Sequence, residues 1–367
     1  MSPSGDDNWT DINNIVNTTV QRGGVNTPYH ARAETYIVPL VFAVIFLVGV
    51  IGNSTLIWVF LRNKVMRSVP NTFLVSLAAG DLTVLLFAVP FIGTIYTFES
   101  WPYGEFVCKL SEFLRDLSVG VTVLSLAALS VDRYVAVIKP LHKQRDERQK
   151  IMSITVVVVI WVISIGLAIP SAYFSFIYEM LAGGEVIKIC YPFPPELGHW
   201  YPRATVLVKF LVLYVIPLVV ISVFYTLMAQ HLLLSTRQNV IKNASHTRQL
   251  EARHKVAWTV LSLAVIFCIC FFPSHLFMLW FYFYSDSWNA YNDFWHAWKI
   301  VGYVLTFANS CLNPVALYCV SSVFRNYFQR YLFCCCHSVV HRQRTLTNRT
   351  TYTSLRSTIK NSATTKV

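Results

Sequence analysis

Three polar side chains, Asp132, Arg133 and Tyr134, stand together at the end of an apolar stretch that begins at Leu117. Charged groups beside hydrocarbon are costly and usually have a task there, so this cluster is a candidate functional site. The loop that follows is basic, with Lys139, Lys143, Arg145, Arg148 and Lys150. Because basic loops remain in the cytoplasm, we expect the cluster to contact an intracellular partner.

Polar groups also lie within the apolar stretches. Asp81 is surrounded by amides and hydroxyls at a similar depth when successive stretches are threaded in alternating directions. A carboxylate among neutral oxygens suits a small, hard cation, which predicts a sodium ion and no other cofactor. A buried acid satisfied by the same neighbours, with no ion, fits the spacing equally well. The predicted ligands are Asp81, Thr122, Asn309, Ser310 and Asn313, with Asn53 beside them.

Composition and run length decide the fold class. Of the 367 residues, 55% are hydrophobic and 13% are charged, which is about half the charged fraction of a soluble domain. An apolar run of about 20 residues spans a bilayer as one helix. The sequence therefore predicts an all-α membrane protein, a seven-transmembrane helix bundle, and excludes a soluble protein. The runs cover 37–61, 72–96, 106–138, 151–177, 204–234, 256–284 and 297–320.

The distribution of positive charge orients this bundle. The segments after the first, third, fifth and seventh runs contain 21 Lys and Arg residues, whereas the N-terminal tail and the other loops contain 4. The positive-inside rule then predicts a multi-pass plasma-membrane protein with an extracellular N-terminus and a cytoplasmic C-terminus. A net charge of +12 would indicate nucleic acid in a soluble protein. Here it indicates topology and contacts with membrane lipid, and no nucleic-acid partner is expected.

The cysteines divide between the two predicted sides. Cys108 and Cys190 are the two on the outer side, where disulfides persist, and they are predicted to bond to each other. Such a bond would tie the second outer loop to the third helix. A second group follows a stretch of alternating aromatic and basic residues typical of an interfacial helix. This group, Cys334, Cys335 and Cys336, predicts S-palmitoylation, with unmodified thiols as the alternative.

The two tails complete the domain organisation. Asn8 and Asn17 match the glycosylation pattern and lie on the predicted outer tail. The last three residues, 365–367, resemble a ligand of a PDZ domain, and a free disordered tail is the simpler alternative. The expected regions are an extracellular tail (1–36), the bundle (37–320), an amphipathic helix with the palmitoylation cluster (321–336) and a cytoplasmic tail (337–367).

Prolines occur inside five of the apolar runs. Each removes a backbone hydrogen bond and permits a kink, which transmembrane helices tolerate when neighbours satisfy the freed carbonyl. Their distribution predicts a bundle that opens into an outer cavity and has hinges for motion. The sixth run is the favoured hinge because Phe271 and Phe272 precede its proline. The five are Pro90, Pro170, Pro217, Pro273 and Pro314.

Short motifs recur on the predicted helices in a fixed order. They are Gly52-Asn53, Leu77 to Asp81, Asp132-Arg133-Tyr134, Trp161, Pro217 with Tyr225, Cys270 to Pro273, and Asn313-Pro314. Each is weak alone, but together they resemble the rhodopsin-like (class A) G-protein-coupled receptors over residues 37–336. The segments that begin at Cys108, Ser118 and Phe307 are similar to bombesin and endothelin receptors. The run from His275 to Tyr282 is similar to arthropod CCHamide peptide receptors.

This resemblance implies a neuropeptide receptor that couples to a heterotrimeric G protein of the Gq class, with phospholipase C and calcium downstream and arrestin at its tail. It assigns G-protein coupling to Arg133, within the Asp132-Arg133-Tyr134 cluster, and to Tyr225. It assigns the activation switch to five residues. These are Phe271, Pro273, Asn313, Pro314 and Tyr318.

Three positions depart from the family pattern. Phe271 stands where a tryptophan is usual. Leu317 stands where a tyrosine is usual and Tyr318 follows it, which turns the hydroxyl by about 100° around the helix. Arg253 stands where many relatives carry an acid at the base of the sixth helix. We therefore expect Arg133 to be restrained chiefly by Asp132.

The third helix indicates the ligand class. Amine receptors place an aspartate where this chain has Arg115, so the resemblance excludes an amine ligand. Glu112, Arg115 and Asp116 interrupt the apolar run with charges of both signs, and such a polar mouth suits a peptide. The alternative is that these charges merely satisfy one another. The other residues predicted to complete the ligand site are Lys209, His275, Lys299 and Tyr303.

The sequence argues against three functions other than a peptide receptor. Transporters often contain internal repeats, and no second copy of the Asp81 or Asp132 segment is present. A membrane enzyme is not expected, because the histidines lack ligand spacing and Gly-x-Ser-x-Gly and His-Glu-x-x-His are both absent. A lipid receptor on the same fold is the closer alternative.

Overall fold

A computed structural model describes residues 32–138, 146–182, 185–238 and 244–332, with side chains described outside 232–256 and a few other positions. Several sequence predictions lie outside these residues. They are the glycosylation sites Asn8 and Asn17, the cysteines Cys334, Cys335 and Cys336, and the tail 337–367 with its PDZ-type end.

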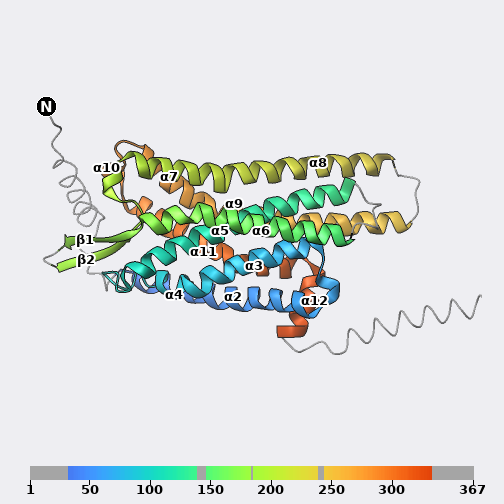
Figure 1. Cartoon of the computed structure of the whole chain (residues 1–367), viewed down its shortest axis with the longest axis horizontal. Helices are drawn as coiled ribbons and strands as arrows, with labels where there is room; N and C mark the ends of the chain where they lie inside the picture. Colours follow the sequence, from blue (N-terminus) through green and yellow to red (C-terminus); the bar gives the residue numbers. More distant parts are fainter. Residues whose placement is uncertain (1–31, 139–145, 183–184, 239–243, 333–367) are drawn as a thin grey trace, which may run out of the picture.

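Seven helical segments are long and apolar enough to cross a membrane, which confirms the predicted fold class. Figure 1 shows them side by side along the long axis of the molecule. They are α2 (Glu34–Arg62), α3 (Val69–Phe87), α5 (Gly104–Ile138), α6 (Asp146–Phe174), α7 with α8 (Trp200–Phe210 and Ile216–Gln238), α9 (Ala244–Phe283) and α11 (Asp293–Val320).

The pattern of burial is that of a bundle in lipid. Val158 and Val162 of α6 are 56% and 63% exposed, whereas Asn53 and Asp81 are fully buried. In a bilayer, both the lipid and the core of the bundle are apolar, so a transmembrane helix can be apolar on every face. Its polar residues therefore mark the face that points into the bundle. The apolar outer surface is therefore expected to face lipid.

Proline positions explain the irregular helices. The second apolar run was predicted as one helix, but α3 ends at Phe87 and α4 (Val89–Ile92) restarts with Pro90 at its second position. In the fifth run, the π-helical turn η4 (Leu211–Val215) precedes Pro217. Both irregularities follow from the missing N–H of proline, which interrupts the backbone ladder.

A β-hairpin covers one end of the bundle and was not predicted. It consists of β1 (Phe176–Ala182) and β2 (Glu185–Tyr191), which pair antiparallel with Ile177 opposite Cys190. The fourth apolar run was expected to remain helical to residue 177, but α6 ends at Phe174. The backbone N–H of Trp101 donates to the carbonyl of Lys188 at 2.8 Å, so a neighbouring loop pairs with the edge of β2.

At the opposite end, the amphipathic helix α12 (Ser322–Leu332) follows α11 and lies beside the end of α2 (Figure 1). Phe324 and Phe328 are one helical turn apart and are both buried against the bundle. The predicted amphipathic helix is thus present within 321–336. Short helices η2 (Lys64–Met66), η3 (Pro195–Leu197) and α10 (Ser287–Ala290) complete the connections.

Candidate functional site

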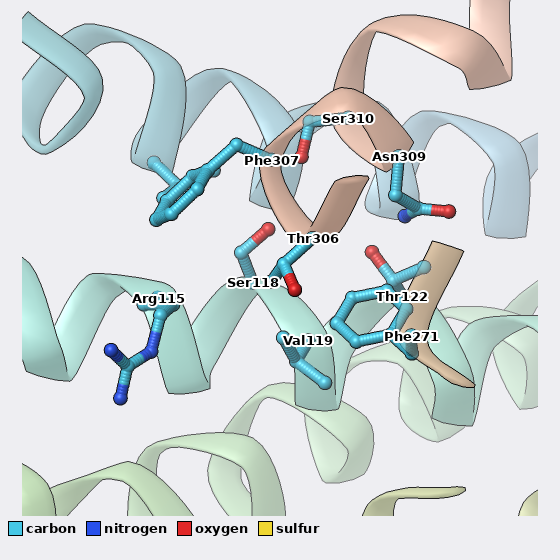
Figure 2. A pocket seen from close by; sticks show the side chains of 10 residues that line it. Arg115, Ser118, Val119, Thr122, Phe271, Thr306, Phe307, Asn309 and Ser310 are labelled. Atoms are coloured by element: carbon cyan, nitrogen blue, oxygen red, sulfur yellow. The ribbon is translucent and has the colours of Figure 1, made fainter. Parts of the chain in front are cut away.

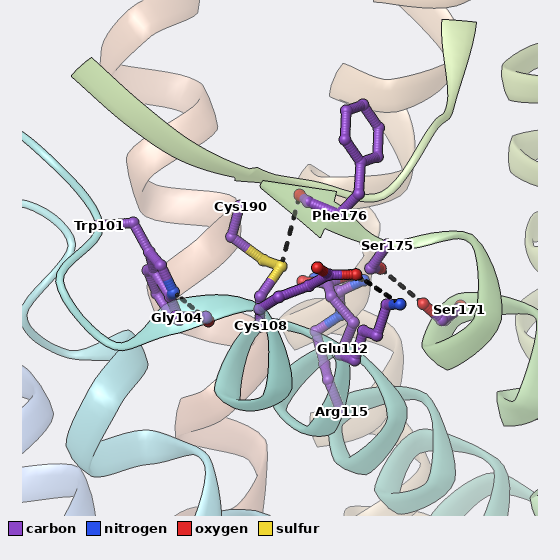
Figure 3. Close-up of a disulfide and its surroundings, with 11 residues drawn as sticks. Trp101, Gly104, Cys108, Glu112, Arg115, Ser171, Ser175, Phe176 and Cys190 are labelled. Carbon is purple, nitrogen blue, oxygen red and sulfur yellow. Dashed lines mark hydrogen bonds and ion pairs between the residues drawn. A yellow bond between two sulfur atoms is a disulfide. The ribbon is translucent and has the colours of Figure 1, made fainter. Parts of the chain in front are cut away.

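The disulfide between Cys108 and Cys190 is formed, as predicted (Figure 3). It joins the first turns of α5 to the last residues of β2, and the two Cα atoms are 5.5 Å apart. The hairpin is therefore attached directly above the charged positions of α5.

Below the disulfide, four of the predicted ligand-site residues form one ionic cluster. Glu112 and Arg115 pair through two hydrogen bonds, and Asp116 lies 3.6 Å from Nε of Arg115. On its other side Asp116 pairs with Nζ of Lys209 at 2.6 Å. Ser171 donates to Asp116 and accepts from Lys209 at 3.0 Å.

The cluster is neutral overall, because two carboxylates face two cations. Glu112 and Asp116 are 9% and 5% exposed, and a buried charge is stable only when it is paired. Glu112, Arg115 and Asp116 therefore do satisfy one another, and Lys209 completes the neutral cluster. It also joins α5, α6 and α7 at one level of the bundle.

The remaining predicted ligand residues lie around this cluster, not within it. The ring of His275 packs 4.8 Å from Tyr214 and 5.6 Å from Phe210. Tyr303 packs 5.3 Å from Phe307, on the side of α2 and α3. Lys299 is exposed and has no ion pair within the described part of the chain.

A hydrogen-bonded chain links α2 to the start of α11 at the rim. Nε2 of His296 lies 3.2 Å from Glu34, and Nδ1 lies 3.1 Å from the hydroxyl of Tyr291. Burial raises the pKa of Tyr291 to about 12, so its hydroxyl remains neutral and available for this bond.

A small cavity leads from the ionic cluster toward the middle of the bundle (Figure 2). Arg115 lines one end, Thr122 and Asn309 line the other, and Phe271 closes the side that faces α9. The space suits roughly one water molecule or a bare ion.

Asp81 lies next to this cavity within a network of buried amides. Nδ2 of Asn313 donates to Oδ2 of Asp81 at 2.9 Å, and Nδ2 of Asn53 donates to the carbonyl of Ser310 at 2.9 Å. Among the described side chains, several buried oxygens nevertheless have no hydrogen-bond donor. These are Oδ1 of Asp81, Asn53, Asn309 and Asn313 and Oγ1 of Thr122.

These oxygens fit the predicted cation. Unsatisfied buried acceptors are unfavourable, and a small, hard cation satisfies several of them at once. The described residues contain no group of three His, Cys, Asp or Glu side chains that could hold a metal ion. The donor set of one carboxylate and neutral oxygens therefore suits sodium better than a transition metal.

The Asp132-Arg133-Tyr134 cluster lies at the opposite end of α5. Arg133 forms two hydrogen bonds with Asp132, and Tyr134 packs edge-on against Phe224 at 5.2 Å. The hydroxyl of Tyr225 donates to the carbonyl of Ala257 at 3.2 Å, which joins α8 to α9. The side chain of Arg253 lies outside the described residues.

Comparison with known proteins agrees with this arrangement. The family "7 transmembrane receptor (rhodopsin family)" matches residues 52–318, which is most of the bundle. The chain belongs to the rhodopsin family of seven-transmembrane receptors. It is thus a member of a receptor family and not of an enzyme family.

Three relatives within this family are similar over most of the chain. The neuropeptide CCHamide-1 receptor of Drosophila melanogaster is 51% identical over 312 residues, which cover 84% of this chain and 62% of that receptor. Bombesin receptor subtype-3 of Ovis aries is 39% identical over 87% of this chain and 79% of its own length. The [Phe13]-bombesin receptor of Bombina orientalis is 37% identical over 87% of this chain and 82% of its own length.

The departures from the rhodopsin-family pattern have structural counterparts. Leu317 is 1% exposed within the core, whereas the hydroxyl of Tyr318 accepts from Gln329 of α12 at 3.4 Å. The shifted tyrosine thus contacts α12. Phe271 packs against Phe267 with the ring centroids 4.5 Å apart and the ring planes tilted by 30°.

Sequence reasoning missed two residues beside these switch positions. The indole N–H of Trp298 donates to the carbonyl of Pro273 at 3.0 Å. One turn further along α11, a Cβ on Gly302 would lie 2.8 Å from the backbone nitrogen of Ser274, so glycine permits this close approach. A tryptophan and a glycine four residues apart were the only sequence signal. Ser171, which bridges the ionic cluster, had no signal beyond being polar in an apolar helix.

Proposed function

We propose that this chain is a plasma-membrane receptor for a neuropeptide of the CCHamide or bombesin type. The 51% identity to a receptor of that name carries the proposal, and two bombesin receptors support it. In the proposed orientation the disulfide end is extracellular and the Arg133 end is cytoplasmic. The basic segments around Arg133 support this orientation through the positive-inside rule.

The proposed peptide site is the hairpin end of the bundle, around the ionic cluster of α5 and α7. Glu112, Arg115, Asp116 and Lys209 already neutralise one another, so a ligand gains by sharing their hydrogen bonds and not by supplying a single charge. That favours a peptide backbone, which carries donors and acceptors along its length. Lys299, His275 and Tyr303 complete the proposed contacts around the rim.

The proposed mechanism is a shift between two packings of the bundle. Peptide contacts act on Phe271, and α9 swings about Pro273, supported by the α11 residues Asn313 and Pro314. The bond between Tyr225 and the α9 carbonyl of Ala257 joins the inner ends in the present packing, so it must break as they part. Arg133 then leaves Asp132 and contacts a G protein, proposed to be of the Gq class with phospholipase C and calcium downstream. Arrestin is the proposed partner of the tail.

The proposed sodium site favours the resting packing. Its ligands would come from α3 (Asp81), α5 (Thr122) and α11 (Asn309, Ser310 and Asn313), and a bound ion supplies positive charge that holds these helices together. A swing of α9 displaces Phe271 from the wall of the cavity. Ion binding and peptide binding are therefore expected to oppose each other.

A ligand panel tests the proposed function. Cells that express this chain are expected to release calcium in response to CCHamide-1-type or bombesin-type peptides, and the response should vanish when Gq is deleted. An Arg133→Ala variant at equal surface expression is the matched control, because it retains the outer site. Calcium release in response to a lipid, with none in response to any peptide of the panel, would contradict the peptide proposal and favour a lipid receptor.

A further inference from the structure

We propose that the N-terminal segment 15–20 of this chain adds a third strand to the hairpin, along the outer edge of β1. The hairpin then becomes a three-stranded sheet over the end of the bundle. The segment lies outside the described residues. Three features support the pairing: the open edge of β1, the composition of the segment and its reach. None of them depends on the proposed peptide ligand.

The two edges of the hairpin differ, and the edge of β2 is closed. The backbone N–H of Trp101 donates to the carbonyl of Lys188 at 2.8 Å, and the N–H of Lys188 donates to Oγ of Ser100 at 3.0 Å. Both backbone groups of Lys188 therefore point away from β1, toward the loop that precedes α5. A two-stranded hairpin alone is marginally stable in water, so this closure supports the sheet on one side.

The register shows that the edge of β1 is open. Residues opposite each other in an antiparallel pair alternate between bonded and non-bonded pairs. Glu179 lies opposite Lys188, so this pair is non-bonded and Glu179 also points its N–H and carbonyl away from the hairpin. Ile177 and Leu181, two residues to either side, do the same. None of these three residues has a backbone partner on the outer edge among the described residues.

Apolar side chains are exposed beside this edge. Leu181 and Val186 lie opposite each other in the hairpin, and they are 65% and 55% exposed. Native proteins usually cover an open strand edge, because its unpaired groups accept another strand. Free backbone groups next to an uncovered apolar pair therefore indicate a missing strand, and an extended segment would satisfy both.

One run in the sequence before α2 has the composition of a strand. Five of the six residues at 15–20 are β-branched, the type of residue that is enriched in strands. Two asparagines precede the run and two glycines follow it shortly after, and such residues commonly bound strands. The run is Ile15, Val16, Asn17, Thr18, Thr19 and Val20.

The connection to α2 is long enough for this pairing. Glu34 in the first turn of α2 lies 3.2 Å from His296 near the start of α11, and Figure 1 shows the start of α2 and the hairpin at the same end of the bundle. Residues 21–31 separate the run from the first described residue, and when extended they span roughly 36 Å. Packed helices lie about 10 Å apart, so the connection can cross the end of the bundle.

The alternation within the run suits the edge of β1. Successive side chains of a strand point to opposite faces, and a glycan on Asn17 must project into solvent. Asn17 therefore belongs on the outer face of the sheet, with exposed Leu181. Val16 and Val20 then lie on the opposite face, in line with Met180, which is 4% exposed. The run thus offers apolar side chains where the sheet faces the bundle.

Hydrogen exchange of the full-length receptor, purified in detergent, tests the pairing. In the parent, the amides of Ile177, Glu179 and Leu181 should exchange slowly, and so should those of the run. Ile15→Pro with Val16→Pro removes two successive N–H groups, one of which faces β1 in either register, and retains the glycosylation pattern at Asn17. In this variant the three amides of β1 should exchange about tenfold faster.

A matched control separates the run from the connection. Gly24→Pro with Val25→Pro also introduces two prolines but leaves the run intact, so its β1 amides should exchange as those of the parent do. Fast exchange of these amides in the parent, or slow exchange that persists in Ile15→Pro, Val16→Pro, would overturn the proposal. Protection that appears only with an added CCHamide-type peptide would make the peptide the occupant. Protection that rises with receptor concentration would make it a second copy of the chain, and either result would also overturn the proposal.

Discussion

At the residue scale, the buried pair between Asp116 and Lys209 gives a direct test of the ionic cluster. Lys209→Met leaves the carboxylate of Asp116 with Arg115 and Ser171 as its partners among the described residues. Loss of one partner of a buried pair costs about 3 kcal/mol or more, so the melting temperature of the purified receptor should fall. Asp116→Asn combined with Lys209→Met should recover part of that loss. A double variant that is less stable than the sum of the two single variants would contradict the pairing.

Asp132 tests how Arg133 is restrained. Asn at this position retains the size of the side chain but removes the charge that Arg133 contacts through two hydrogen bonds. A charge-assisted contact is worth about 1.5 kcal/mol or more, so the ratio of the resting to the active packing should fall roughly tenfold and basal signalling should rise. Inositol phosphate accumulation without ligand measures this at equal surface expression. An unchanged basal level would mean that other contacts hold Arg133.

Asp81 tests the proposed ion. Replacement of sodium by choline in the buffer should tighten binding of a peptide agonist to the parent receptor. Asp81→Asn removes the carboxylate of the site, so its agonist affinity should be independent of sodium. Thr83→Ala is the matched control, because Thr83 lies on the same helix as Asp81. Its hydroxyl donates to the carbonyl of Ala79 within that helix, away from the proposed ion. Sodium sensitivity that persists in Asp81→Asn would favour the ion-free alternative.

At the scale of elements, α9 and α11 meet where Trp298 reaches the carbonyl of Pro273. Trp298→Phe retains an aromatic ring against Phe294 but loses the donor, which should cost about 1 kcal/mol of stability. Gly302→Ala should cost more, because the new methyl group meets the backbone of Ser274. Thermal unfolding of the purified receptor measures both, with Phe294→Leu as the control. If Trp298→Phe melted at the same temperature as the parent receptor, the hydrogen bond from Trp298 to Pro273 would not contribute to stability.

The elements themselves were largely predictable, and their mutual rotation was not. Apolar runs of membrane length gave seven helices, and the location of two cysteines gave the disulfide. A helix that is apolar on all sides carries no periodic signal for the face it turns inward, so pairs such as Trp298 with Pro273 could not be found. The hairpin was missed for a related reason, because the apolar residues that begin β1 continue the run of α6. Asp81 and its amides were predictable because a polar residue in lipid must face inward.

At the scale of the whole molecule, orientation follows from charge and is testable on intact cells. The basic segments should lie in the cytoplasm, so an N-terminal epitope should be accessible to antibody without permeabilisation, and a C-terminal epitope only after it. Asn8→Gln and Asn17→Gln should each remove one glycosidase-sensitive shift on a gel. Asn348→Gln is the control, because Asn348 matches the same pattern on the predicted cytoplasmic tail. If Asn348→Gln removed a glycosidase-sensitive shift, the C-terminal tail would lie outside the cell. The orientation of the bundle would then be the reverse of the proposed one, and the hairpin end could not bind an extracellular peptide.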